Sequence, residues 1–400
     1  MKTLPDGWKK YKIRDIGTVV TGNTPPKNET QNYDGDLPWI KPPDLDNGMF
    51  VSTSVDTISE FGRKKIRLLP KGSVLVSCIG NIGKVAIAEC ELCTNQQINS
   101  IIPYREIVDS VFIYYAIKRI RPKLEEAASS FVVPLLNKTD FSNIELSIPP
   151  LPTQKKIAVV LEKAEKLREW RKEADGLTDA FLKSTFLEMF GDPATNPKGW
   201  KVKKINDVVE IEAGSCVIGE KRPRKENEFA VLMVSAVTKG IFLPNEYKVI
   251  NSSQILKKIV TPEKGDLLFS RANTYELVGA TCLIGENYPY LLLPDKLWKI
   301  KPDISRSCSE YLKFVLSHAA IRKEISNNAS GTSGSMLNIS MSKLKSININ
   351  IPPIELQQKF AHIVHQVEQI REHQTQSRQH IENLFNVLMQ RAFRGELEIK

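Results

Sequence analysis

Two sets of polar and basic residues could give this 400-residue chain a binding chemistry. They combine Arg, Asn and Gln, which form paired hydrogen bonds to purine edges, with Lys, Ser and Thr, which bind phosphate oxygens. The first set consists of Thr24, Lys27, Trp39, Lys41, Ser77, Asn81, Lys84, Gln96 and Gln97. The second set consists of Lys221, Arg222, Arg224, Ser270, Arg271, Asn273, Thr274, Lys296, Thr332 and Ser333. Any one of these residues also fits a solvated loop, but their matching placement in two halves of the chain favours a nucleic-acid-binding surface.

A phosphate-binding loop is the nearest catalytic alternative within the first set. Gly80 and Gly83 precede Lys84, but two residues separate the glycines and Val85 follows the lysine. The nucleotide-binding loop requires four residues between its glycines and a Ser or Thr after its lysine. The segment is therefore predicted to be a turn that presents Asn81 and Lys84.

Other catalytic centres find little support in the sequence. No Pro-Pro pair, including those at 42–43, 149–150 and 352–353, combines a preceding polar residue with a following aromatic residue, as an adenine methyltransferase motif would. Asp34 and Asp36 have no second acidic arm for a nuclease, and all five histidines lie beyond residue 317. Cys90 and Cys93 have the spacing of zinc ligands, but no second pair completes a site. An enzyme is the weaker hypothesis, and no bound cofactor or metal is expected.

The composition fits a protein of two or three domains with an anionic partner. The net charge is +10, and 41% of the residues are hydrophobic. No run approaches the roughly 20 apolar residues of a membrane span, and the polar start lacks a signal-peptide core. The six cysteines are scattered, as in a reducing compartment. We therefore expect a cytoplasmic protein without membrane contact.

The sequence elements that would position both sets occur twice. Gly7-Trp8-Lys9 recurs as Gly199-Trp200-Lys201, at an offset of 192 residues (199 − 7). The order of the later matches is the same: Lys71-Gly72 with Lys264-Gly265, Leu136-Asn137 with Leu337-Asn338, and Ile148-Pro149-Pro150 with Ile351-Pro352-Pro353. A period this long predicts a duplicated domain rather than a solenoid.

Each half is predicted to begin with a mixed α/β block, over residues 1–150 and 193–350. Short apolar runs at 74–76 and 85–87, with a turn between them, predict strands, and runs at 267–269 and 280–283 repeat the pattern. Residues 110–120 predict a helix that stops before Pro122. The fold class is α+β.

A long helix is predicted to follow each block, over residues 151–192 and 351–400. The first should span about 35 residues, or roughly 50 Å. Matched apolar heptads predict that the two helices pair as an antiparallel, coiled-coil-like spacer with pseudo-two-fold symmetry. The stripe is broken once in each helix, which predicts either a polar layer that fixes the register or a point where the helices diverge. The predicted inter-helix residues are Val160, Leu167, Arg171, Phe181, Ile363, Ile370, Gln374 and Leu384.

Taken together, these motifs resemble the DNA-specificity subunit of type I restriction–modification systems (HsdS). The resemblance covers essentially the whole chain and includes two Gly-Trp-Lys starts, two Lys-Gly strand starts and two Pro-Pro helix starts with Gln154 and Gln357. The ending Ala392-Phe393-Arg394-Gly395-Glu396-Leu397 is similar as well. Residues 95–97 and 294–296 differ between the halves, where half-site specificity should differ.

The resemblance implies two target-recognition domains, each reading one half of a bipartite site in double-stranded DNA, with the helices setting the gap. It implies a non-catalytic subunit that docks two methyltransferase (modification) subunits, and restriction subunits that complete the nuclease. S-adenosylmethionine and ATP would be bound by those partners. The alternatives are the specificity subunit of a related system that cuts and methylates with one polypeptide, and a scaffold that does not read sequence.

Overall fold

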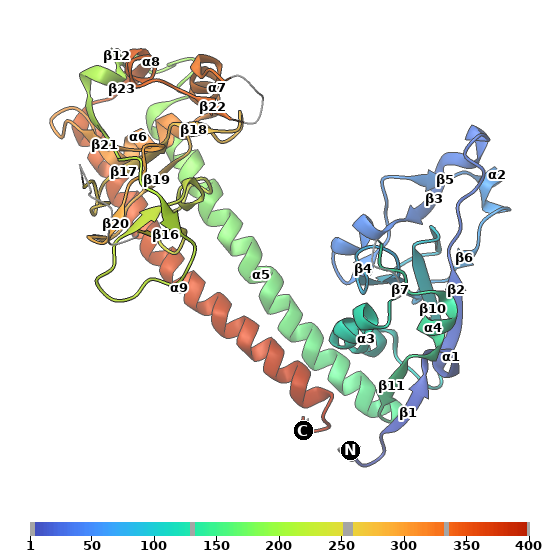
Figure 1. Cartoon of the computed structure of the whole chain (residues 1–400). Helices are drawn as coiled ribbons and strands as arrows, with labels where there is room; N and C mark the ends of the chain where they lie inside the picture. The colour runs from blue at the N-terminus through green and yellow to red at the C-terminus, as the bar shows by residue number, and fades with distance from the viewer. Residues whose placement is uncertain (1–4, 129–132, 251–258, 332–335, 398–400) are drawn as a thin grey trace. The chain divides into compact units, whose positions relative to one another are not determined.

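The computed structural model describes residues 5–128, 133–250, 259–331 and 336–397. The chain forms two compact units (Figure 1): the first contains Met1–Lys172 and Gln376–Lys400, and the second contains Glu173–Thr375. Each unit holds one α/β block and half of each long helix, α5 (Leu151–Phe190) and α9 (Ile354–Ala392). The predicted boundaries at 150, 192 and 350 separate blocks from helices, whereas the compact units divide inside the helices.

The first unit is built on a five-stranded sheet. Its order is β2 (Gly17–Thr21), β10 (Ile98–Pro103), β7 (Val74–Ser77), β8 (Val85–Ala88) and β4 (Phe50–Val51). A four-stranded sheet has the order β5 (Thr57–Ile58), β3 (Tyr33–Ile40), β9 (Leu92–Thr94) and β6 (Leu68–Leu69), and β1 (Lys9–Lys12) pairs with β11 (Glu145–Ile148). The helices are α1 (Ile13–Ile16), α2 (Glu60–Arg63), α3 (Ser110–Glu126) and α4 (Lys138–Asn143). The strands predicted at 74–76 and 85–87 are present and pair antiparallel.

The second unit repeats this plan with different additions. One sheet has the order β13 (Val209–Ala213), β21 (Leu297–Pro302), β17 (Leu267–Ser270) and β19 (Thr281–Leu283). Another has the order β14 (Gly219–Glu220), β16 (Tyr247–Ile250), β15 (Ala230–Leu232) and β20 (Leu291–Leu292). Two pairs complete the strands: β12 (Lys201–Lys204) with β23 (Asn348–Ile351), and β18 (Ala272–Asn273) with β22 (Leu337–Asn338). The helices are α6 (Ser309–Ser317), α7 (Ala319–Asn328) and α8 (Met341–Ser346).

The predicted duplication extends to individual hydrogen bonds at the starts of the long helices. Gln154 is fully buried, and its amide donates to the carbonyl oxygens of Pro149 and Ile107 while accepting from the Asp109 amide. Gln357, also fully buried, does the same with Pro352, Arg306 and the Cys308 amide. Each glutamine therefore ties a rigid Pro-Pro turn to the loop before the helix that packs on the long helix.

Each long helix is buried mainly through its own unit's core. In the first unit, Phe385 and Phe393 of the chain's last segment contact Tyr115 and Phe112 of α3, with ring centroids 6.3 and 5.2 Å apart. In the second unit, Phe186 of α5 and Phe360 of α9 lie 5.6 Å apart beside Phe314 of α6. Within that unit Thr178 also meets Gln374, so the α5 and α9 segments run antiparallel, as predicted.

The predicted heptad stripe is buried only in part. Ile157 and Ala164 of α5, and Phe360 and Val367 of α9, belong to it and are at most 4% exposed. Leu167, Phe181, Ile370 and Leu384 are 40–51% exposed, while Val160 and Ile363 are half-buried. The buried residues are their successors or neighbours Leu161, Leu182, Val364 and Phe385. Because α5 and α9 pack against α3 and α6 as well as against each other, the face they bury is set by three helices and not by a two-helix seam.

Two further sequence expectations are corrected by the structure. The helix at 110–120 continues through Pro122 to Glu126. The fully buried Leu124 lies beyond the proline, and its packing offsets the backbone hydrogen bond that Pro122 removes. The structural counterpart of Leu136-Asn137 is Ile339-Ser340 and not Leu337-Asn338, because Asn137 and Ser340 are the N-caps of α4 and α8.

Candidate nucleic-acid interface

The turn between β7 and β8 contains three of the predicted contact residues. Ser77 is fully buried; its hydroxyl donates to the Asn81 carbonyl oxygen at 2.6 Å and accepts from the Lys84 amide at 2.9 Å. Gly83 adopts a φ of +81°, which closes this turn. The buried Ser77 hydroxyl thus stabilises the turn by bonding its backbone. The exposed Asn81 is the side chain that the turn presents to solvent.

The orientation of Asn81 depends on a residue that the sequence analysis missed. Arg121 of α3 donates from Nη2 to Asn81 Oδ1 at 2.8 Å and is paired with Glu125 at 2.9 Å. On the other side of the turn, Lys84 forms an ion pair with Asp46. The i,i+4 spacing of Arg121 and Glu125 was visible in the sequence, but the contact to Asn81 spans 40 positions and was not.

The remaining first-set residues form two small groups. The Thr24 hydroxyl donates to Oε1 of the exposed Gln96, and Gln97 is closed onto Asn95 by two hydrogen bonds. Trp39 is 6% exposed and covered by the Lys41 amine, 4.4 Å from its ring centroid. Trp39 is therefore a core residue and not an open stacking platform, which corrects its placement among the surface contacts. Lys27 is exposed.

In the second unit, the side chains of Arg222 and Arg224 bond to Glu228 and so stabilise the loop to which all three residues belong. Arg222 makes a two-bond ion pair with Glu228, at 2.8 and 2.9 Å, and Arg224 Nη1 donates to the Glu228 carbonyl oxygen. The Arg222 hydrogen bonds lower the pKa of Glu228 to about 2. The exposed Lys221 precedes this loop. Glu228 is a further residue that sequence reasoning did not single out.

Arg271 leaves strand β17 with its guanidinium held in place. Its Nε donates to the Asp295 carbonyl oxygen at 2.9 Å, and its side chain stays 31% exposed. Lys296 is half-buried and linked to Arg271 through the backbone. Ser270 is fully buried, whereas Asn273 and Thr274 are half-buried after it. Thr332 and Ser333 lie outside the described residues.

Equivalent backbone positions carry different side chains in the two units. The Cys78 amide donates to the Gln97 carbonyl oxygen and the Cys78 carbonyl oxygen accepts from the Leu136 amide, both at 2.8 Å. Arg271 makes the same two bonds with Lys296 and Ile339, both at 3.0 Å. One scaffold thus presents a buried cysteine thiol in the first unit and a cation in the second.

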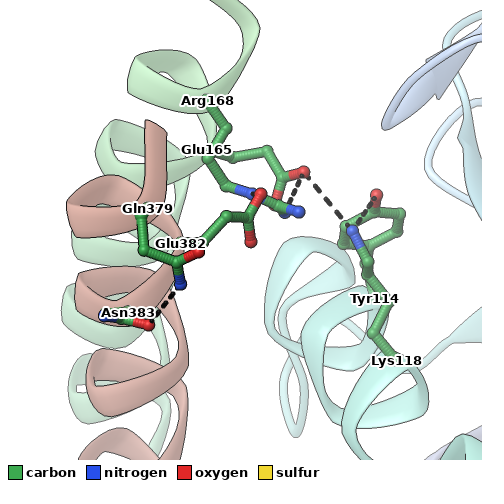
Figure 2. A network of polar contacts seen from close by, with 7 residues as sticks. All are labelled: Tyr114, Lys118, Glu165, Arg168, Gln379, Glu382 and Asn383. Atoms are coloured by element: carbon green, nitrogen blue, oxygen red, sulfur yellow. Dashed lines mark hydrogen bonds and ion pairs between the residues drawn. The ribbon is translucent and has the colours of Figure 1, made fainter. Parts of the chain in front are cut away.

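An arginine-centred polar layer joins α5 and α9 in each unit, and in the first unit, which Figure 2 shows, it also joins them to α3. In the first unit, Arg168 of α5 bonds Glu165 at 3.1 Å and Glu382 of α9 at 2.9 Å, and Lys118 of α3 reaches Glu165 at 3.4 Å. In the second unit, Arg371 repeats the arrangement with Glu368 and Asp179. This duplicated arginine layer was missed, although the offset of 203 residues (371 − 168) that relates the heptads also relates these two arginines.

The two residues of the predicted polar break, Arg171 and Gln374, belong to different units. Gln374 donates to the Thr178 hydroxyl at 3.0 Å within the second unit. Arg171 belongs to the first unit and is half-buried. The break therefore takes the form of a threonine–glutamine pair in the second unit, one turn from the arginine layer.

The described residues contain neither a candidate metal site nor a candidate membrane-spanning helix. In that part of the chain no group of three or more His, Cys, Asp or Glu side chains could hold a metal ion. Cys93 is buried against the Pro38 carbonyl oxygen, and burial raises the pKa of its thiol to about 12. No helix within the described ranges is long and apolar enough to cross a membrane.

Comparisons with known proteins give a consistent result. The family model described as "Type I restriction modification DNA specificity domain" matches residues 5–174 and 197–383. The MjaIX specificity subunit of Methanocaldococcus jannaschii is 28% identical over 78% of this chain and 81% of its own length. The EcoKI specificity subunit of Escherichia coli K12 is 26% identical over 98% and 90%. A solved S subunit from M. genitalium covers 100% of this chain and 99% of its own, with a TM-score of 0.59 at 13% identity, a likeness of fold.

Proposed function

The chain belongs to the type I restriction–modification DNA specificity family, and we propose that its two units read the two halves of a bipartite site in double-stranded DNA. The observation that carries the proposal is the shared backbone frame with divergent side chains. Cys78 and Arg271 make the same backbone bonds, yet only Arg271 could donate to a guanine edge. Two units with the same backbone arrangement and different surface side chains suit a protein that recognises two different half-sites.

Two side chains whose positions are fixed by hydrogen bonds support sequence-specific contacts to bases, in addition to nonspecific attraction to phosphates. Arg121 orients Asn81, and the Asp295 carbonyl oxygen orients Arg271. A side chain whose position is fixed before binding loses less conformational entropy when it bonds a base edge. The exposed Lys27 and Lys221, together with the net charge of +10, would supply the affinity for phosphates that does not depend on sequence.

The long helices would set the gap between half-sites and receive the modification subunits. Leu167 and Trp170 in the first unit, and Leu177 and Phe181 in the second, are 40–63% exposed on α5. Apolar side chains gathered along a helix favour a protein partner. In this proposal the partners are two methyltransferase subunits, joined by restriction subunits, and these bind S-adenosylmethionine and ATP. The chain itself would be non-catalytic and would work in the cytoplasm.

Single-molecule methylation mapping tests the proposal. DNA is taken from cells that carry this chain with its neighbouring methyltransferase, and from cells in which this chain is deleted. A bipartite methylated motif with a fixed spacer, lost on deletion, is the expected result. Methylation unchanged by the deletion would contradict sequence reading and favour a scaffold role.

A further inference from the structure

A cleft in the second unit is lined in part by residues, Lys313 among them, that have no role in the proposed DNA contacts or in the pairing of α5 with α9. Its volume is about 510 Å³, within the range of small-molecule sites. It lies between the second-unit ends of the long helices, α6 and the loop at 239–241, all of which belong to that unit. Its apolar wall includes Leu182, Phe186, Leu187, Ile241 and Phe314.

The charged wall of the cleft is cationic. Lys183, Lys239, Lys313 and Arg371 line it, against one carboxylate, Asp179. The Arg371 charge is already matched, because Arg371 pairs with both Asp179 and Glu368. Lys313 differs: within the described residues its amine makes no hydrogen bond or ion pair. Burial lowers the pKa of Lys313, and the Glu368 charge opposes that shift in part.

In the first unit the corresponding helix carries a cation that is paired: Lys118 of α3 lies 3.4 Å from Glu165 (Figure 2). Ser110 and Ser309 donate the same hydrogen bond, to Gly72 and Gly265, so they align α3 with α6. On that alignment Lys313 stands where Tyr114 stands, and Ser317 stands where Lys118 pairs with Glu165. The lysine of α6 therefore lies one helical turn before the position that aligns with Lys118. At that place Lys313 has no carboxylate in an ion pair within the described residues and lines an open cleft.

We propose that this cleft binds a small organic monoanion, whose aromatic or aliphatic body packs against Phe186, Leu187 and Ile241 while its carboxylate or sulfonate pairs with the Lys313 amine. The half-buried Lys313 amine offers one positive charge to one negative group, and a charge-assisted hydrogen bond is stronger than a neutral one. The apolar wall favours a ligand with an aromatic or aliphatic part over an inorganic ion such as chloride or sulfate. The site is independent of the proposed DNA contacts.

The probe is 4-phenylbutyrate, titrated into the full-length chain and followed by calorimetry and ligand-observed NMR. Its neutral amide, 4-phenylbutyramide, reports on the apolar wall alone. We expect saturable binding of the carboxylate, and Lys313→Met should weaken it by about tenfold, the cost of one charged contact. The same variant should leave the affinity for the amide unchanged.

Two further variants make the test decisive. Leu187→Trp fills the cleft from a position that is 45% exposed, so the fold tolerates it, and it should abolish binding of both probes. Lys118→Met, the matched cation in the first unit, should leave both affinities as in the wild type. The proposal is overturned if the wild type shows no saturable binding, if Lys313→Met binds the carboxylate as tightly as the wild type, or if Lys118→Met removes binding. None of these outcomes bears on DNA reading, which methylation mapping decides.

Discussion

Cys78 and Arg271 occupy the same place in the two units, at the end of the strand that crosses the middle of each main sheet. Both residues link the following loop to the same two neighbouring segments through their backbone amide and carbonyl groups. Only the side chain differs, so this pair allows the contribution of a side chain to be separated from that of the fold.

Arg271→Ala should relax one half-site and leave the other intact. Loss of a paired contact to a guanine costs about 1–3 kcal/mol, or roughly ten- to a hundredfold in affinity for that half. Binding to oligonucleotides randomised in either half measures this, with methyltransferase partners present. Cys78→Ala is the matched control and should leave both halves unchanged. Equal weakening of both halves would instead make Arg271 a phosphate contact.

Lys221→Ala should weaken DNA binding by a similar factor for every sequence. Its exposed amine suits a phosphate contact, so the slope of log affinity against log salt should fall by about one unit. Titrations at several salt concentrations, on cognate and random DNA, give this slope. An unchanged slope would remove Lys221 from the interface.

Gln154→Leu should destabilise the first unit, and Gln357→Leu the second. Each change leaves one buried amide and two carbonyl oxygens without their partner, at a cost of about 2–4 kcal/mol. Hydrogen exchange followed by mass spectrometry resolves the two units. Faster exchange confined to the altered unit is expected, and uniform exchange across both units would contradict the independence of these two cores.

Glu228→Gln should lower the stability of the second unit at neutral pH and matter less in acid. The folded pKa of Glu228, about 2, lies below its ordinary value of 4.5, so the stabilisation is complete above 4.5 and is lost as pH falls toward 2. Unfolding temperatures of the wild type and the variant should therefore converge as the pH falls from about 4.5 to about 2. Glu226→Gln, at an exposed neighbouring position, is the control and should show no such convergence.

Removing one matched heptad from each long helix should shorten the DNA spacer and leave both half-sites unchanged. Deleting residues 169–175 and 372–378 removes about 10 Å from each helix, or roughly three base pairs. The duplicated register of α5 and α9 motivates the paired deletion. Methylation mapping reads the spacer directly, and a spacer that stays the same would show that the helices do not set it.

The duplication and its helices could be predicted from the sequence because they rest on local signals. Gly-Trp-Lys, Lys-Gly and Pro-Pro-Gln recur at nearly constant offsets, and each fixes a turn or a helix start. Part of the heptad stripe is buried as predicted, but other positions are displaced by one residue, because periodicity cannot show that α3 and α6 also cover the long helices. Pro122 was assigned as a stop by a local rule that the burial of Leu124 overrides.

The candidate interface was less predictable, because its residues are positioned by partners far along the chain. Ser77, Ser270 and Trp39 looked like surface contacts but are buried. Glu228 and Arg121 were not singled out from the sequence, yet they decide where Arg222 and Asn81 lie. Residue type indicated the chemistry, but only the fold separates side chains that present it from those that support it.

The division of the chain into units also sets an order of events during synthesis. The second unit is one continuous segment, Glu173–Thr375, and all of it has been made before Gln376 is added. The first unit needs Phe385 and Phe393 to fill the core around α3, so its core stays incomplete until these two residues have left the ribosome. The half made first is thus the half that finishes folding last, and a truncated product would carry one complete reader with an unfinished one.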